Sequence, residues 1–190
     1  MFSAPPRRPP AEGEVVRDVT VANSNGIPRA LSELAVDGLL LVIVYRGNWC
    51  AFCLRQLAEY RHLSGEFTKL GIRIVALSVD ESATSARLRK TGNLPFELLC
   101  DTDRSVITEW DLVNVRDNRS AFPVTYLLDA NLRIRFASVD DGYSAARAAD
   151  VLPYCVNVVK GLKAAQPKQR LRIPGPMWWV RGAMNQLGPK

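Results

Sequence analysis

The sequence predicts an α/β sandwich built on a central mixed β-sheet with helices on its faces, and three observations lead to that prediction. Strand-like runs alternate with segments of helical periodicity, in the order strand, helix, strand, helix, strand, helix, hairpin and closing helix. Residues 39–45 form a continuous aliphatic run, as expected of a central strand covered on both faces. The 190 residues, 47% of them hydrophobic, suffice for one folded domain with appendages.

The first elements precede the long helix. Residues 15–21 have the composition of a strand and lead to the Asn25-Gly26 turn signal. Residues 28–34 are predicted to form a short helical turn. The aliphatic run at 39–45 then supplies the strand in the middle of the sheet.

The remaining elements follow from periodicity and turn signals. Between Cys50 and Leu70 apolar residues recur at spacings of three and four, which predicts an amphipathic helix ended by Gly71. The later elements are a strand at 72–79, a helix at 82–90, a strand at 96–100, a helix at 105–110, a hairpin of 124–128 with 132–137, and a final helix from Ser144 to about Ala165.

Composition divides the chain into three parts. Residues 1–13 are rich in proline and are predicted to be a flexible arm, 14–165 are the folded domain, and 166–190 are a basic tail with adjacent Trp178 and Trp179. The start of the chain lacks the apolar core of a signal peptide, and the longest apolar run is too short to cross a bilayer, so we expect a cytoplasmic protein without a transmembrane segment.

The excess positive charge is confined to the tail. Residues 160–190 hold seven Lys and Arg and no acid, whereas 1–159 hold 18 basic and 19 acidic residues. This distribution argues against a nucleic-acid-binding body, whose basic residues would cover a folded face. For residues 168–190 it leaves three alternatives: a peripheral contact with an anionic membrane, a docking segment for a protein partner, or a segment that folds back on its own domain.

The chemistry of the sequence centres on a C-x-x-C, Cys50 and Cys53, at the junction of the buried strand and the long helix. Free backbone amides and the macrodipole at a helix start favour a thiolate, so the pKa of Cys50 is expected to be lowered. Cys53 lies one turn along the same helix face, within reach of a mixed disulfide on Cys50. Cys50 is therefore predicted to be the nucleophile and Cys53 the resolving residue.

Two other roles for the pair are less consistent with the sequence. A structural zinc site needs four ligands, and the chain offers one C-x-x-C, the isolated Cys100 and Cys155, and the lone His62. A permanent structural disulfide is unusual in an intracellular domain of this size. We therefore expect no metal, and the sequence lacks the Gly-rich phosphate loop that would indicate an organic cofactor.

The residues around the pair resemble the thioredoxin-like proteins, and among them the peroxiredoxin-like AhpC/TSA (alkyl hydroperoxide reductase and thiol-specific antioxidant) group. Three segments within residues 14–162 carry the resemblance: Y-R-G-N-W-C-A-F-C at 45–53, F-E-L-L-C-D-T-D at 96–103 and F-P-V-T-Y-L-L-D at 122–129. The resemblance implies a thioredoxin-like fold with a peroxiredoxin-type elaboration.

The resemblance also implies a substrate groove beside the cysteines, lined by Trp49, Phe52, Phe122 and Pro123. Pro123 would be the cis-proline that faces the C-x-x-C, and the alternative is an ordinary trans-proline at the start of a strand. Trp49 either lines this groove or caps the sheet.

The sequence departs from the peroxidase pattern of this family at three positions. With Cys53 aligned on the peroxidatic cysteine, Arg46 replaces the usual proline, Cys50 replaces the threonine or serine, and Pro123 holds the place of the second-signature arginine. These positions supply the donors that polarise the peroxide O–O bond, so their change weakens a peroxidase assignment. Arg46 and Arg119 are candidates for a substitute guanidinium.

The sequence therefore favours a thiol-disulfide oxidoreductase that uses Cys50 and Cys53 on a protein or small-molecule disulfide. The alternative enzyme is a thiol-dependent peroxidase that reduces hydrogen or alkyl hydroperoxides, with Cys53 oxidised first and Cys50 resolving. Both activities need an external thiol reductant. A third hypothesis is a redox-sensing binding module that docks through its C-terminal tail.

Overall fold

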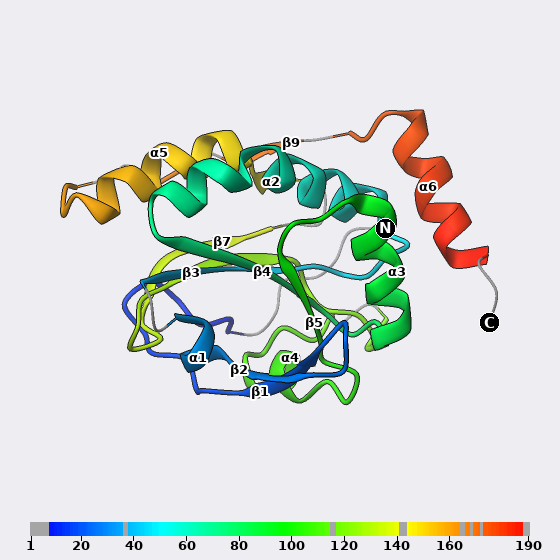
Figure 1. The fold of residues 1–190 in the computed structure, drawn as a ribbon, viewed down its shortest axis with the longest axis horizontal. Helices are drawn as coiled ribbons and strands as arrows, with labels where there is room; N and C mark the ends of the chain where they lie inside the picture. The colour runs from blue at the N-terminus through cyan, green and yellow to red at the C-terminus, as the bar shows by residue number, and fades with distance from the viewer. Residues whose placement is uncertain are drawn as a thin grey trace.

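The computed structural model describes residues 8–35, 38–114, 117–140, 144–163, 166–167, 169–171 and 173–187. A mixed seven-stranded sheet lies at its centre (Figure 1). Its strands are β1 (Thr20–Asn23), β2 (Pro28–Ala30), β3 (Leu39–Val44), β4 (Ile72–Ser78), β5 (Glu97–Cys100), β6 (Val124–Leu128) and β7 (Ile134–Val139). Their order across the sheet is β2-β1-β5-β4-β3-β6-β7.

The strand directions place the segment before Cys50 and the segment after β4 at the same edge of the sheet. β3, β4 and β5 run parallel to one another, whereas β1, β6 and β7 pair antiparallel with their neighbours. The segments that follow Val44 and Ser78 therefore leave the sheet side by side, and the amide of Tyr45 still donates to the carbonyl of Leu77. In open α/β sheets this carboxyl edge is where sites form.

Helices cover both faces of the sheet, as predicted. They are α1 (Leu31–Ala35), α2 (Ala51–Lys69), α3 (Ser82–Gly92), α4 (Ser105–Glu109) and α5 (Ala148–Val159). α2 and α5 lie together over one face, with α1 and α4 on the other (Figure 1). β3 contributes Leu41 and Ile43 to one apolar core and Leu40, Val42 and Val44 to the other, which explains its unbroken aliphatic sequence.

The N-terminal hairpin differs from the prediction. The strand starts at Thr20 instead of residue 15, and residues 28–30 pair with it as β2 before α1 begins at Leu31. The side-chain oxygen of Asn23 accepts hydrogen bonds from the amides of Asn25 and Ile27, which closes a tight turn. The turn folds residues 28–30 back into the sheet, so the helical turn predicted for 28–34 covers only its second half.

The C-terminal region also departs from the prediction of one long helix over 144–165. Residues 144–146 form β8, which pairs with β9 (Gln169–Leu171), and α5 starts only at Ala148. Beyond Val159 the chain turns at Gly161, whose φ of +67° ends the helix. A further helix, α6 (Pro176–Leu187), folds back against α2, while the predicted end at Ala165 lies outside the described residues.

Hydrogen bonds tie residues 8–13 of the predicted arm to the domain. The amide of Arg8 donates to Asp111 and the amide of Gly13 to the carbonyl of Ile134. Residues 1–7 lie outside the described part of the chain. None of the helices in the described ranges combines the length and the apolar character that a membrane span requires.

Packing of α2 on the sheet is the first testable feature of this fold. Leu57 is buried in the core beneath α2, and its replacement in Leu57→Ala is expected to lower the free energy of unfolding by about 3 kcal/mol through lost burial and a residual cavity. Denaturant unfolding followed by circular dichroism measures the loss. Glu66→Ala, on the exposed face of the same helix, should change stability by less than about 0.5 kcal/mol, and equal losses in the two variants would contradict this packing.

Candidate active site

Cys50 and Cys53 lie at the start of α2, where the chain leaves the central strand, as the sequence predicted. They are joined by a disulfide, with their Cα atoms 5.2 Å apart. Cys50 is the N-cap residue of α2, and its Sγ accepts a hydrogen bond from the amide of Cys53 at 3.3 Å. After reduction, this amide and the positive end of the helix would stabilise negative charge on the sulfur.

The turn between β3 and α2 is held by Asp80, which follows the neighbouring strand β4. Its Oδ2 accepts hydrogen bonds from the amide of Asn48 at 2.8 Å and from the hydroxyl of Ser78 at 3.0 Å. Gly47 adopts a φ of +151°, and a Cβ there would come within 2.8 Å of Trp49 Nε1 and 3.1 Å of Asp80 Oδ1. The turn therefore requires glycine at this position.

Burial raises the pKa of Asp80 above its ordinary range, and the hydrogen bonds from Ser78 and Asn48 only partly offset this. Asp80 follows β4, so it lies at the same edge of the sheet as the turn that leads to Cys50. Its contacts make it the residue that positions the segment leading to Cys50.

The two reactive side chains are covered. Cys50 is 2% exposed and Cys53 is 3% exposed. α6 lies directly against the backbone beside them, because a Cβ at Gly182 would overlap the carbonyl oxygen of Trp49. Asn185 Nδ2 donates to the carbonyl of Asn48 at 2.8 Å, and Asn48 Nδ2 donates to the carbonyl of Asn185 at 3.4 Å.

Further contacts fix the rest of α6 on the domain. The ring of Phe52 meets that of Trp179 edge to face, with centroids 5.5 Å apart, and Trp178 packs against the core under α2. Arg181 donates to the carbonyl of Thr91, at 2.6 Å. Of the alternatives for the tail, residues 173–187 thus match the segment that folds back, although Trp179 remains 52% exposed.

Arg46 and Trp49 form the surface next to Cys50. The guanidinium carbon of Arg46 lies 5.6 Å from the centroid of the Trp49 ring, in a cation–π contact. The charge of Arg46 also lowers the pKa of Asp117, which lies in the loop that carries Arg119. Burial raises the pKa of Asp117, but hydrogen bonds from Ser120 and from the amide of Arg119, together with the charge of Arg46, lower it below its ordinary value. Arg119 itself is exposed.

The profile of the AhpC/TSA family matches residues 13–137, which is more than half of the chain. The chain belongs to the AhpC/TSA family. The match includes the Cys50–Cys53 pair and strands β1 to β6, ends within β7, and stops before α5 and α6.

Named relatives and solved structures agree with this assignment. The chain is 27% identical to the chloroplastic peroxiredoxin Q of Arabidopsis thaliana over 124 residues, which is 63% of this chain and 55% of that protein. The peroxiredoxin Q of Oryza sativa subsp. japonica is 29% identical over 64% of this chain and 55% of its own length. The chain thus spans about half the length of these curated relatives.

Among solved structures, peroxidoxin BcpB of Mycobacterium tuberculosis superposes with a TM-score of 0.70 at 19% identity, covering 80% of this chain and 98% of that one. The 2-Cys peroxiredoxin of Plasmodium vivax gives a TM-score of 0.71 at 15% identity, with coverages of 79% and 97%. At these identities the likeness establishes the thioredoxin-like fold alone.

The prediction that Pro123 is a cis-proline is wrong. No peptide bond within the described ranges is cis, and Pro123 directly precedes β6. Its carbonyl accepts the amide of Asp140 at 3.0 Å, and Val124 pairs with Val139 directly after it. The trans bond at Pro123, just before a strand, is the alternative that the sequence left open.

The structure places only part of the predicted groove beside the cysteines. Trp49 is 36% exposed, and Phe52 is half-buried against Trp179. Phe122 is buried in the core on the sheet face opposite α2, so its predicted place in the groove is wrong. Pro123 is likewise buried.

Sequence reasoning missed several residues that surround the site. Gln56 lies one turn after Cys53, and its Nε2 donates to the buried hydroxyl of Thr125 on β6 at 3.3 Å. A polar residue on the apolar face of the helix was the available signal. No sequence pattern predicted the contacts of Gly182 and Asn185, because periodicity and motif spacing do not indicate which residues far apart in the sequence are in contact.

The remaining cysteines and the histidine lie outside the site. Cys100 and Cys155 are buried and free, and burial raises the pKa of both thiols, that of Cys155 to about 12. These environments suit inert core residues. His62 is exposed on α2, next to Arg61.

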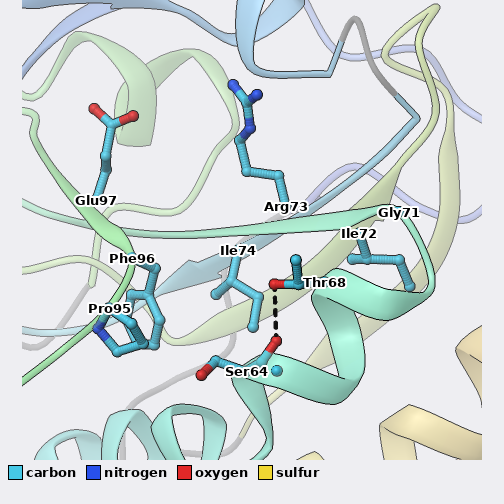
Figure 2. Close-up of a pocket in the computed structure, with 10 residues that line it drawn as sticks. Ser64, Thr68, Gly71, Ile72, Arg73, Ile74, Pro95, Phe96 and Glu97 are labelled. Atoms are coloured by element: carbon cyan, nitrogen blue, oxygen red, sulfur yellow. Dashed lines mark hydrogen bonds between the residues drawn. The ribbon is translucent and has the colours of Figure 1, made fainter.

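A separate hollow of about 680 Å³ lies at the far end of α2, away from the cysteines (Figure 2). Ser64, Thr68, Ile74 and Phe96 line it, and Thr68 donates to the carbonyl of Ser64 within α2. Arg73 and Glu97 point away from these α2 residues (Figure 2). Across the described residues, no group of His, Cys, Asp and Glu is arranged to hold a metal ion.

The raised pKa of Asp80 gives a pH dependence with a defined sign. The native state keeps its proton to a higher pH than the unfolded chain, whose Asp pKa is about 3.9. Asp80 therefore stabilises the wild type relative to Asp80→Asn most at low pH. The difference in the free energy of unfolding, wild type minus variant, should fall as pH rises from about 3.9 through the raised pKa and then level off. Denaturant unfolding at a series of pH values measures this difference.

Asp103→Asn is the matched control with the opposite sign. The amide of Ser105 donates to Asp103 and lowers its pKa, so the corresponding difference should rise with pH and be lost as pH falls. A difference for Asp80→Asn that also rises with pH would contradict the buried environment described for Asp80.

Proposed function

We propose that the chain is a thiol-dependent peroxidase that reduces hydroperoxides with Cys53 and Cys50 and is recycled by an external thiol. The observation that carries the proposal is a redox-capable cysteine pair, buried at the start of α2, within an AhpC/TSA domain. The relatives and solved neighbours named above are peroxiredoxins. This reverses the order of preference that the sequence suggested, in which disulfide exchange came first.

Each step of the proposed cycle balances. The Cys53 thiolate attacks one peroxide oxygen, so an S–O bond forms, the O–O bond breaks, and the leaving alkoxide takes a proton to become an alcohol. The Cys50 thiolate then attacks the Cys53 sulfur, which forms the S–S bond and expels hydroxide, released as water. An external dithiol supplies two electrons and two protons to restore both cysteines.

Burial of the pair supports a small oxidant. With Cys50 and Cys53 only 2% and 3% exposed, a hydroperoxide of a few atoms reaches a sulfur more readily than the disulfide of a folded protein does. Arg46 is the guanidinium that we propose for the charge developing on the leaving oxygen, because it lies in the turn before Cys50 and against Trp49. It would replace the family arginine whose place Pro123 holds.

One observation favours thiol-disulfide exchange as a second candidate. Cys50 is the helix cap whose sulfur accepts the Cys53 amide, which is the environment of an attacking thiolate in disulfide exchange. In that mechanism Cys50 reacts first and Cys53 resolves. The two candidates therefore assign opposite roles to the two cysteines.

Single-turnover reactions of cysteine variants test the proposal. Cys50→Ser should reduce one equivalent of hydrogen peroxide and accumulate a sulfenic acid on Cys53, trapped with dimedone and located by mass spectrometry. Cys53→Ser should react with peroxide at least about 100-fold more slowly than the wild type, because it lacks the proposed nucleophile. Cys100→Ala, which alters a buried free cysteine, should stay within twofold of the wild type.

The reverse pattern would contradict the peroxidase mechanism. In that pattern, Cys50→Ser is inert towards peroxide. The reduced wild type is also oxidised faster by a disulfide substrate than by peroxide, and this faster reaction requires Cys50. Thiol-disulfide exchange would then replace the peroxidase mechanism as the proposed function. Tryptophan fluorescence follows both oxidations, since Trp49 adjoins Cys50.

A further inference from the structure

α6 covers the backbone that carries the cysteines, although it lies outside the residues that match the AhpC/TSA family. Gly182 faces the carbonyl oxygen of Trp49 and lies so close that even a Cβ would overlap it. Asn185 exchanges two hydrogen bonds with Asn48, the residue whose amide binds Asp80. These contacts lie within a few residues of Cys50 in the chain.

We propose that α6 is a lid that sets which thiols reach the Cys50–Cys53 disulfide, with Gly182 and Asn185 as the specificity-determining residues. In the closed position small thiols react, and the thiol of a folded protein reacts only after α6 moves away. The role of this lid in catalysis rests on the proposed function, because the lid acts on the reduction of the disulfide that ends the proposed cycle.

The chemistry of disulfide exchange supplies the reason. An attacking thiolate must reach a disulfide sulfur directly and form an S–S bond to it as the bond between Cys50 and Cys53 breaks. The attacking cysteine of a protein brings its backbone and neighbouring side chains with it. Side chains exposed by 2% and 3% leave no room for such an approach.

The contacts at the lid are few enough to open. Near the cysteines they consist of the Asn48–Asn185 hydrogen bonds, the close approach of Gly182 and the edge-to-face contact between Phe52 and Trp179. The opposite side of α6 packs on nothing in the described chain, since Met177, Val180 and Met184 are all exposed. Loss of one net hydrogen bond shifts such an equilibrium about fivefold.

Two substitutions loosen the lid by different means. Gly182→Ala adds a methyl group that collides with a backbone oxygen, so α6 must shift away from Trp49. Asn185→Ala removes the side chain that donates to the Asn48 carbonyl and leaves the rest of α6 unchanged. Gly65→Ala, where a Cβ meets no atom within 4 Å, and Gln186→Ala, an exposed neighbour, are matched controls.

The experiment measures reduction of the oxidised full-length protein by two probes, dithiothreitol and the protein dithiol thioredoxin. Samples are quenched with N-ethylmaleimide and the labelled cysteines counted by mass spectrometry. We expect the ratio of the thioredoxin rate to the dithiothreitol rate to rise about fivefold in Gly182→Ala and in Asn185→Ala. The ratio should stay within twofold of the wild type in both controls.

A ratio that does not change in either lid variant, with both variants folded by circular dichroism, overturns the lid. Should Gly182→Ala unfold the domain, Asn185→Ala alone decides, because it adds no atoms to the interface. The readout requires no peroxide, so a failure of the peroxidase mechanism leaves this ratio interpretable, and a failure of the lid leaves the single-turnover test of Cys53 intact.

Discussion

The hydrogen bond from the Asn48 amide to the Asp80 carboxylate is the interaction on which the arrangement of the site depends. It exists because β3 and β4 are parallel neighbours, so the residues that follow both strands meet at one edge of the sheet. It fixes the turn through Gly47 and thereby places Cys50 as the cap of α2. With its amide committed to Asp80, Asn48 presents its carbonyl and side chain to Asn185. One residue thus connects the sheet, the cysteines and α6.

The four cysteines show how strongly position decides reactivity. All four are buried, and burial alone raises the pKa of a thiol, as it does for Cys100 and Cys155. At the start of α2, free backbone amides and the helix macrodipole oppose this effect, and an amide already points at Cys50. Among the four cysteines, water exclusion therefore coexists with groups that stabilise a thiolate only at the C-x-x-C.

Short-range sequence patterns predicted the elements whose formation depends on neighbouring residues. The aliphatic run of β3, the periodicity of α2 and the C-x-x-C between them were each readable within about 20 residues, and all three are confirmed. The errors arose where distant pairing decides the outcome. Residues 28–30 pair with β1, and residues 144–146 pair with β9 instead of starting the predicted helix. The contact of Asn48 with Asn185 joins residues 137 apart, beyond any periodicity.

The same distinction explains how the site departs from its family while the fold does not. Strands β1 to β6 and α2 fall inside the matched residues 13–137, and packing of two apolar cores holds them in place. Loops and the C-terminal helix carry the features that the resemblance did not imply: Arg46 in the turn, a trans Pro123, and α6 against the backbone beside the cysteines. Arg46 and α6 bear on the charge and the access around Cys50 and Cys53, whereas Pro123 is buried directly before β6. In the proposed mechanism, charge and access around the pair, more than the fold, decide which oxidant and which thiol react with it.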